Sequence, residues 1–232
     1  MKKLAIIPAY NESMNITKTV EDILNNAPGF DYVIVDDCST DATRSVCRER
    51  GFNLLHLPAN LGIGGAVQTG YQYARDFGYD IAVQFDGDGQ HSAAYLETMV
   101  KELKEKQLDM VIGSRFIRKE GFQSTAFRQL GIRYFSLLIR AVTGHTITDP
   151  TSGMRMVNRD LIEFFAVDYP KDYPEPESVS AVLRNGKRVG EVPVIMRQRA
   201  GGVSSISPSR SIYYMVKVTL AILMVLLRRK QL

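Results

Sequence analysis

Short apolar runs alternate with helical patterns along the first half of the 232-residue chain, and this order limits the folds that it can adopt. The apolar runs lie at residues 4–8, 32–36, 53–57, 81–86 and 110–113, and helical periodicity separates them at residues 16–25, 42–50, 63–77 and 93–106. Strands that alternate with helices favour a mostly parallel sheet covered on both faces. We therefore predict an α/β fold with a mostly parallel central sheet flanked by helices.

The second half of the chain follows a different pattern. Residues 127–142 predict an amphipathic helix, and a strand is expected near residues 190–196, before a loop of small residues. Three prolines lie between residues 170 and 176, and we interpret them as excluding a regular helix there.

Composition excludes several classes of protein. With 45% hydrophobic and 23% charged residues, the sequence has the balance of a packed globular protein rather than a disordered one. No run reaches the roughly 18 apolar residues of a spanning helix. Cys38 and Cys47 lack metal-ligand spacing, which favours reduced thiols in a cytosolic protein. The net charge is +4, and basic residues concentrate in the second half, which suits anionic ligands or a membrane surface better than nucleic acid.

Polar residues follow the predicted strands at the points where these strands end. Residues 9–12 follow the first strand, Asp36 and Asp37 end the second, and Asp86 and Asp88 follow the fourth. In parallel α/β sheets, ligands bind beyond the carboxyl ends of the strands. We therefore expect these three clusters to converge on one site.

The segment 86–91, with the sequence Asp-Gly-Asp-Gly-Gln-His, is the most informative of these clusters. Two carboxylates one residue apart, in a backbone that glycines allow to turn tightly, can share a hard divalent cation. Such a cation neutralises a diphosphate and stabilises it as a leaving group. A solvated Asp-Gly turn is the alternative interpretation. An EF-hand loop is excluded, because its sixth position would be His91 instead of glycine.

Residues 36–41 combine two patterns. Ser39 or Thr40 is expected to cap the next helix, with Asp41 in its first turn. Capping does not account for the adjacent carboxylates of Asp36 and Asp37. A carboxylate at this strand end could accept the imide N–H of uracil or a ribose hydroxyl.

The glycine-rich stretch 61–66 matches a dinucleotide-binding loop poorly, because Val67 stands where the last glycine should be. We expect a helix N-terminus that packs tightly against the nucleotide region. Direct contact with phosphate is the alternative.

A run of basic residues follows the fifth predicted strand. Its members are Arg115, Arg118, Lys119, Arg128 and Arg133. Charge runs are often solvated surface, but guanidinium groups also form forked hydrogen bonds with phosphate. These residues are therefore candidates for binding an anionic acceptor.

Taken together, these motifs resemble those of family 2 glycosyltransferases of the GT-A fold. More narrowly, the sequence is similar to the polyprenyl-phosphate glycosyltransferases, which include dolichol-phosphate mannose synthase and bacterial undecaprenyl-phosphate glucosyl- and N-acetylglucosaminyltransferases. The similarity runs from residue 4 to about residue 206. It rests on segments 7–12, 35–37, 86–91, 113–115 and 149–155, and on Arg199 with Gly202, Ser204 and Ser205. It implies a Rossmann-like GT-A sheet.

The resemblance implies a role for each matching residue. The residues that would hold the nucleotide sugar are Pro8, Tyr10, Glu12, Asp36, Asp86, Arg199 and Ser204. Asp88 and Gln90 would ligate Mn²⁺ or Mg²⁺. The residues that would bind the acceptor phosphate are Arg115, Arg128 and Arg133, and the expected catalytic set is Asp86, Asp88, Arg115 and Arg128. Ser205 departs from the lysine that mannose synthases tend to have, which puts a phosphate contact there in doubt.

The function that the resemblance implies is inverting transfer of glucose or N-acetylglucosamine from a UDP-sugar to a polyprenyl phosphate such as undecaprenyl phosphate. The product would be a lipid-linked sugar donor for modifying cell-envelope polysaccharide. A lipid phosphate has a second pKa of about 6, so it is largely a dianion and needs little help from a base. Positioning and charge stabilisation should then dominate. No motif distinguishes the sugars, or UDP from GDP.

The chain divides into an expected catalytic domain, 1–207, and a C-terminal helix, 208–232. The ten apolar residues 218–227 would span about 15 Å, half of a bilayer core of about 30 Å. The helix could lie in the membrane interface with the basic residues 228–230 near headgroups, pack against another subunit, or bind a small membrane-protein partner. The first arrangement makes the enzyme peripheral at the cytoplasmic face of the cell membrane.

Two other functions fit the same sequence. Transfer to a saccharide hydroxyl would need a carboxylate base, such as Asp149 or Glu175. A non-catalytic subunit that binds nucleotide sugar is the second. The complete set of Asp86, Asp88 and Gln90 argues against it. The stretch 174–177 has no assigned role, although it could contact the donor sugar.

Overall fold

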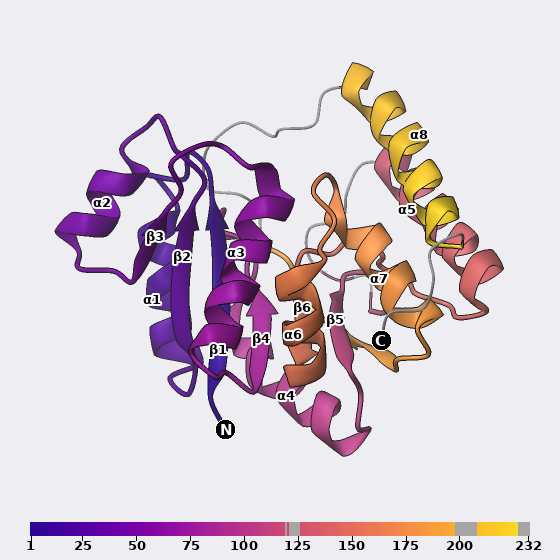
Figure 1. Cartoon of the computed structure of the whole chain (residues 1–232), viewed down its shortest axis with the longest axis horizontal. Coiled ribbons are helices and arrows are strands. Elements are labelled where there is room, and N and C mark those ends of the chain that lie inside the picture. Colours follow the sequence, from indigo (N-terminus) through magenta and orange to yellow (C-terminus); the bar gives the residue numbers. More distant parts are fainter. Residues whose placement is uncertain (119, 121–125, 198–207, 227–232) are drawn as a thin grey trace.

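The computed structural model describes residues 1–118, 120, 126–197 and 208–226 (Figure 1). A seven-stranded sheet has the order β3-β2-β1-β4-β6-β5-β7. Its strands are β1 (Lys3–Ala9), β2 (Asp31–Asp36), β3 (Leu54–His56), β4 (Ile81–Gln84), β5 (Met110–Ser114), β6 (Arg155–Asn158) and β7 (Val189–Pro193). Neighbouring strands are parallel, except that β6 runs antiparallel to β4 and β5. The predicted mostly parallel sheet is confirmed.

Helices cover both faces of this sheet. They are α1 (Ile16–Asn26), α2 (Thr43–Glu49), α3 (Gly62–Asp76), α4 (Leu96–Glu105), α5 (Ala126–Thr143), α6 (Arg159–Val167), α7 (Pro174–Arg184) and α8 (Pro208–Val225), with a 3₁₀ turn, Ala93–Tyr95, before α4. Helices α3 and α6 pack against each other on one face, and α1 and α4 cover the other (Figure 1).

Strand β1 shows why both faces are covered. Leu4 and Ile6 belong to the core under α3 and α6, whereas Ala5 and Ile7 belong to the core under α1 and α4. All four side chains are fully buried. Because successive side chains of a strand face opposite sides, an unbroken apolar run is typical of a strand buried on both faces.

Three elements of the second half differ from the predicted ones. The sequence patterns do not predict β6 or α6. Helix α7 begins at Pro174 and includes Pro176, so the expectation that the prolines exclude a helix is wrong at its C-terminal end. Both prolines lie in the first turn, where a backbone N–H has no partner within the helix and its absence costs little.

Helices α5 and α8 pack against each other at one end of the molecule (Figure 1). Tyr134 on α5 and Thr219 on α8 share a hydrogen bond of 3.1 Å between their hydroxyl oxygens. Val218 and Ile222 of α8 are buried in the same core as Phe135 of α5. The described part of the C-terminal helix therefore packs onto the rest of the chain.

Candidate active site

The ends of three strands are joined at one edge of the sheet. The backbone N–H of Asp37, after β2, donates to the carbonyl of Ala9 at 2.9 Å. The N–H of Gly87, after β4, donates to the carbonyl of Pro8 at 3.3 Å. The polar residues that follow β1, β2 and β4 are thereby brought together, as expected for the carboxyl ends of parallel strands.

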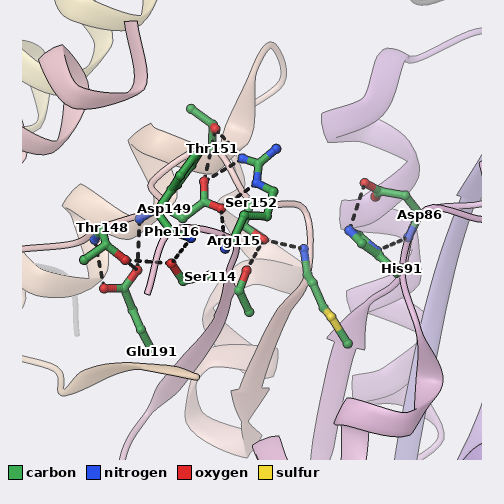
Figure 2. Close-up of polar contacts among 12 residues, drawn as sticks. Asp86, His91, Ser114, Arg115, Phe116, Thr148, Asp149, Thr151, Ser152 and Glu191 are labelled. Atoms are coloured by element: carbon green, nitrogen blue, oxygen red, sulfur yellow. Dashed lines mark hydrogen bonds and ion pairs between the residues drawn. The ribbon is translucent and has the colours of Figure 1, made fainter. Parts of the chain in front are cut away.

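Asp86 is held from three sides. Its Oδ1 accepts a hydrogen bond from Gln84 Nε2 at 3.0 Å. Its backbone N–H donates to His91 Nδ1 at 3.1 Å, as Figure 2 shows. His91 Nε2 lies 3.8 Å from Asp86 Oδ2. Gly153 closes that side, because a Cβ there would lie 2.3 Å from the same oxygen. The Asp86 side chain is 32% exposed, so part of it reaches the surface of the site. Its contacts with Gln84, His91 and Gly153 hold it in one orientation.

Asp88 and Gln90, the expected metal ligands, lie in the turn that follows. Asp88 Oδ1 accepts the backbone N–H of Gln90 at 3.0 Å, and Gly89 makes the turn with a φ of +74°. Among the described residues, no group of three or more His, Cys, Asp or Glu side chains could hold a metal. Within this loop Asp88 and Gln90 offer oxygen donors, which fits Mg²⁺ or Mn²⁺ that keeps some waters and shares a substrate diphosphate.

The segment after β7 is anchored to this loop. The backbone N–H of Arg197 donates to the carbonyl of Gln90 at 2.9 Å, and Gln90 Nε2 donates to the carbonyl of Arg197 at 3.3 Å. The guanidinium of Arg197 also reaches Asp22 Oδ1 at 3.2 Å. Arg199 and Ser204, expected to close over the donor, follow this anchor but lie outside the described residues.

Asp36, an expected nucleotide contact, is fully buried. Its Oδ1 accepts the N–H of Ser39 at 3.1 Å, and its Oδ2 lies 2.8 Å from His56 Nδ1. His56 ends β3 directly beside Asp36, and its side chain is 26% exposed. Asp36 therefore orients the His56 ring, and His56 is the member of this pair that reaches the surface of the site.

Asp37 fixes the start of α3. It is 3% exposed, and its Oδ1 accepts the N–H of Leu61 at 2.6 Å. The N–H of Gly64, in the first turn, donates to the carbonyl of Lys171 at 3.1 Å, and a Cβ on Gly64 would lie 2.1 Å from the carbonyl oxygen of Pro170. The glycine-rich stretch is therefore the start of a helix, packed tightly against residues 170–171 after α6, and its Gly64 amide is already bonded within the protein. The expected packing against the nucleotide region stays a prediction.

The loop after β1 interlocks with the loop after β2. Asn11 has a φ of +58°, and its Oδ1 accepts the backbone N–H of Thr40 at 2.8 Å and of Asp41 at 3.2 Å. Ser39 Oγ accepts the N–H of Asn11 at 2.9 Å. The expectation that Ser39 or Thr40 caps α2 is therefore wrong. The N-cap position is Ala42, which makes no side-chain capping bond, and Asp41, one residue earlier, accepts the N–H of Thr43 with its Oδ1 at 2.9 Å.

The three nucleotide contacts expected on the first loop differ in exposure. Pro8 is buried within β1, and Glu12 is 9% exposed, with Oε2 accepting from Asn15 Nδ2 at 2.8 Å. Tyr10 is 48% exposed. Of the three, Tyr10 presents the largest free surface for stacking on a base.

Arg115 forms a buried ion pair with Asp149 (Figure 2). Its Nε and Nη2 each donate to one carboxylate oxygen at 2.6 Å, and Nη2 also reaches Thr151 Oγ1 at 2.9 Å. Arg115 is 6% exposed and Asp149 is 0% exposed. The fork that was expected to bind the acceptor phosphate is thus occupied by a carboxylate, and a phosphate would have to share the guanidinium with it.

Strands β5 and β7 hold the Asp149 loop in place (Figure 2). Glu191 accepts the backbone N–H of Thr148 at 2.8 Å and of Asp149 at 3.0 Å. Ser152 Oγ donates to the carbonyl of Gly113 at 2.7 Å. The loop is therefore fixed at both ends. Asp149 is bonded to Arg115, and Gly153, at the other end of the loop, packs against the Asp86 carboxylate.

Arg128 and Arg133 both lie on α5 and are exposed. Although Arg128 is exposed, loss of hydration from surrounding atoms lowers its pKa, and the like charge of Arg115 lowers that pKa further. Arg128 and Arg115 are therefore neighbours. Arg133 follows five residues later, about 140° around the helix, so it does not share a face with Arg128. The structure brings together two of the three expected arginines.

Glu175 lies in the first turn of α7, beside the same site. Burial raises its pKa, the charge of Arg155 opposes that rise, and the charge of Asp86 adds to it. Its Oε1 lies 3.9 Å from Arg155 Nη2, and its side chain is 18% exposed. A carboxylate from the stretch 174–177 therefore faces the region of Asp86.

Three residues of the site are not identified by the sequence motifs. His56 ends a strand of only three residues. Arg155 is the last residue of segment 149–155, which resembles the family motif, but the resemblance assigned no role to Arg155. Gln84 lies in an otherwise apolar strand and is 0% exposed. A polar residue at such a position needs a buried hydrogen-bond partner, and this is the signal that could have identified Gln84.

Residues 4–165 match the family model described as Glycosyl transferase family 2. The chain is 30% identical over 216 residues to an undecaprenyl-phosphate mannosyltransferase of Micrococcus luteus, a match that covers 89% of this chain and 88% of that protein. It is 28% identical to a polyprenol monophosphomannose synthase of Mycolicibacterium smegmatis, over 94% and 85% of the two chains. It is also 28% identical to a UDP-N-acetylglucosamine–dolichyl-phosphate N-acetylglucosaminyltransferase of Methanococcus voltae, over 82% and 83%.

Solved structures share the fold. Glucosyl-3-phosphoglycerate synthase from Mycobacterium tuberculosis, in complex with phosphoglyceric acid, superposes with a TM-score of 0.74 at 17% identity, over 97% of this chain and 79% of that one. The complex of that enzyme with Mn²⁺, UDP and phosphoglyceric acid gives a TM-score of 0.72 at 18% identity, over 96% and 77%. These similarities confirm the predicted GT-A architecture.

Proposed function

The chain belongs to glycosyl transferase family 2, and on that premise we propose that it transfers a sugar from a nucleotide diphosphate to a polyprenyl phosphate. Family membership makes it a glycosyltransferase. Relatives named for undecaprenyl, polyprenol and dolichyl phosphates support the acceptor. For the donor we propose a UDP-sugar carrying glucose or N-acetylglucosamine, which the Methanococcus voltae relative supports for the nucleotide.

One structural observation carries this proposal. The loop from Thr148 to Gly153 holds Arg115 through Asp149 and packs its last glycine against Asp86. It thereby sets the loop of Asp86 and Asp88, which suits a cation and a diphosphate, beside the arginine pair of Arg115 and Arg128, which suits a phosphate. Two neighbouring anion sites fit a donor diphosphate and an acceptor phosphate.

In the proposed reaction, catalysis depends mainly on positioning the two substrates and on offsetting the negative charges of their phosphates. A divalent cation at Asp88 and Gln90 would offset the charge of the donor diphosphate. An acceptor phosphate oxygen attacks the anomeric carbon as the bond from that carbon to the diphosphate oxygen breaks on the opposite side, so the configuration inverts. The nucleoside diphosphate leaves with the bonding electrons. Arg128, with Arg115 behind it, would hold the dianionic acceptor in line, and no proton has to be removed from it.

The outer surfaces of α5 and α8 support a membrane location. Leu130 and Leu137 on α5 are 65% exposed, and Val216, Leu220 and Met224 on α8 are 56–57% exposed. Within the described residues, none of the helices has the length and apolar character needed to span a bilayer. Exposed apolar patches mark interaction surfaces. We propose that this patch lies in the interface at the cytoplasmic face of the cell membrane.

In this arrangement residues 1–207 carry out the transfer and the C-terminal helix, 208–232, contributes to the membrane surface. Arg128 on α5 would then stand where a lipid phosphate arrives from the headgroup layer. A second subunit or a small membrane protein covering the same patch is the alternative.

The proposal is tested by incubating the protein with Mn²⁺ or Mg²⁺, labelled nucleotide sugars and undecaprenyl phosphate in vesicles, and identifying the lipid product by mass spectrometry. A metal-dependent sugar-phosphate lipid is the expected product. Transfer to a saccharide alone, or binding of nucleotide sugars without turnover, would contradict the proposed acceptor.

Replacement of Arg128 by alanine is expected to raise the KM for the polyprenyl phosphate by about 10–100-fold, because a charge-assisted hydrogen bond contributes roughly 1.5–3 kcal/mol. The KM for the nucleotide sugar should change little. Steady-state kinetics in vesicles would measure both. Arg140→Ala, in the last turn of the same helix, is the matched control. An unchanged acceptor KM and rate in Arg128→Ala would rule out the lipid-phosphate acceptor at this position.

Replacement of Glu175 by glutamine separates the proposed acceptor from a saccharide hydroxyl. The raised pKa of Glu175 would suit a general base, whose loss lowers kcat by about 10²–10⁴-fold. A phosphate acceptor needs no base, so we expect kcat to stay within about tenfold of the unmodified enzyme. Asp149, the other candidate base, has both carboxylate oxygens bonded to Arg115. A loss beyond a hundredfold would favour the hydroxyl acceptor.

A further inference from the structure

Arg155 is a fully buried arginine at the start of β6, with 1% exposure. Its Nη2 donates to Gln84 Oε1 at 2.7 Å and to Tyr169 OH at 2.8 Å. Its Nη1 donates to Ser178 Oγ and, at 3.3 Å, to the carbonyl of Glu175. A buried charge is costly unless it is bonded, and both Nη groups are held in place by β4, α7 and the segment after α6, although the buried Nε has no hydrogen-bond partner among the described residues.

Gln84 links the fixed guanidinium of Arg155 to Asp86 in the site. Its Oε1 accepts from Arg155, which leaves its Nε2 pointing at Asp86 Oδ1, 3.0 Å away. An amide that rotated by half a turn would set its N–H groups against the guanidinium, so Arg155 determines which end of Gln84 faces Asp86. Gly153 and His91 close the remaining sides of the carboxylate. Asp86 is therefore set by a chain of buried groups that begins at Arg155.

Asp88 Oδ1 accepts the N–H of Gln90 within the same turn, whereas Asp86 Oδ1 is bonded to the buried Gln84 side chain. We propose that Arg155 is a positioning residue for sugar transfer, which acts through Gln84 to hold the Asp86 carboxylate against the donor. This inference rests on the proposed donor site, but not on the identity of the acceptor.

The physical reason is preorganisation. A carboxylate fixed before the substrate binds does not have to be reoriented during the reaction, and its contribution is greatest where charge develops. Misplacement of such a group by about 1 Å can lower the rate by about 10²-fold. Tyr169 bonds the same guanidinium, and among the described residues its hydroxyl makes no hydrogen bond with Gln84 or Asp86.

The test compares two hydrogen-bond partners of Arg155 Nη2, namely Gln84 and Tyr169. Gln84→Met removes the link to Asp86, and Tyr169→Phe removes one buried partner of the same Nη2. Both should lower Tm to a similar degree. We expect Gln84→Met to lower kcat about 100-fold with little change in acceptor KM, and Tyr169→Phe to stay within about threefold. Calorimetry of UDP binding with Mn²⁺ gives a second readout, in which only Gln84→Met should weaken the metal-dependent part.

The outcomes separate this inference from the proposed function. Equal losses of kcat in the two variants would overturn it, because Arg155 would then matter only for folding. An unchanged kcat and unchanged Mn²⁺-dependent UDP binding in Gln84→Met would overturn it as well. If polyprenyl phosphate is not the acceptor, the UDP measurement still decides whether Gln84 positions the donor site.

Discussion

Replacement of Asp88 by alanine is expected to lower kcat/KM for the nucleotide sugar by about 10³-fold, or roughly 4 kcal/mol of transition-state stabilisation. Asp88 would supply a carboxylate to a cation that is otherwise bound by Gln90 and the substrate. With so few protein ligands, loss of one carboxylate leaves the charge of the diphosphate uncompensated. Assays over a range of Mn²⁺ concentrations would measure the loss, and calorimetry of UDP with and without Mn²⁺ would locate it in donor binding.

The control for this prediction is Asp76→Ala, at the last residue of α3 and therefore at the opposite edge of the sheet. Asp76 is an exposed carboxylate paired only with the adjacent Arg75, at 2.8 Å, in the part of the chain that the structure describes. It should leave the kinetics unchanged. Asp88→Ala should also keep a near-normal Tm, because Asp88 lies in a partly exposed turn, where loss of one hydrogen bond costs little. Full Mn²⁺-dependent activity in Asp88→Ala would show that the metal is held elsewhere.

Replacement of Asp149 by alanine is expected to lower the free energy of unfolding by about 3–5 kcal/mol, because it leaves the buried guanidinium of Arg115 without its carboxylate. The loss should be partly recovered in the double variant Arg115→Met/Asp149→Ala, which removes both charges. Urea denaturation of the unmodified protein, the single variants Asp149→Ala and Arg115→Met, and the double variant would measure the coupling between the two residues.

A surface ion pair of the same length provides the comparison. Lys106 Nζ and Glu102 Oε1 lie 2.6 Å apart at the C-terminal end of α4, where the Lys106 side chain is 64% exposed, and this distance equals that between Arg115 Nη2 and Asp149 Oδ1. Glu102→Ala should cost less than about 0.5 kcal/mol, because water solvates the charge that is left. Similar losses at the two positions would mean that the Arg115–Asp149 pair is hydrated in solution.

The sheet was predictable because its strands bear a local signal. Residues 4–8 are apolar on both faces of a strand, and only burial between two helix layers accommodates such a run. The segment that forms β6 has no such signal, since Arg155 begins the strand with a charge. Its burial depends on Gln84, Tyr169 and Ser178, which lie far from it in sequence.

The site was predictable in its location but not in its pairings. The strand ends placed Asp36, Asp37 and Asp86 at one edge, and the structure brings them together there. Sequence spacing does not show that Asp36 is bonded to His56 or that Arg115 is bonded to Asp149. These pairs form between segments at least 20 residues apart, so only the folded topology determines them.

The apolar patch on α5 and α8 has a consequence for how the two substrates meet. The nucleotide sugar would arrive by diffusion in three dimensions, whereas a polyprenyl phosphate would arrive by lateral diffusion within the bilayer. With Leu137 and Leu220 embedded in the bilayer, the acceptor would never leave the lipid phase. Turnover would then follow the mole fraction of acceptor in the bilayer rather than its bulk concentration, as in enzymes that work on a surface.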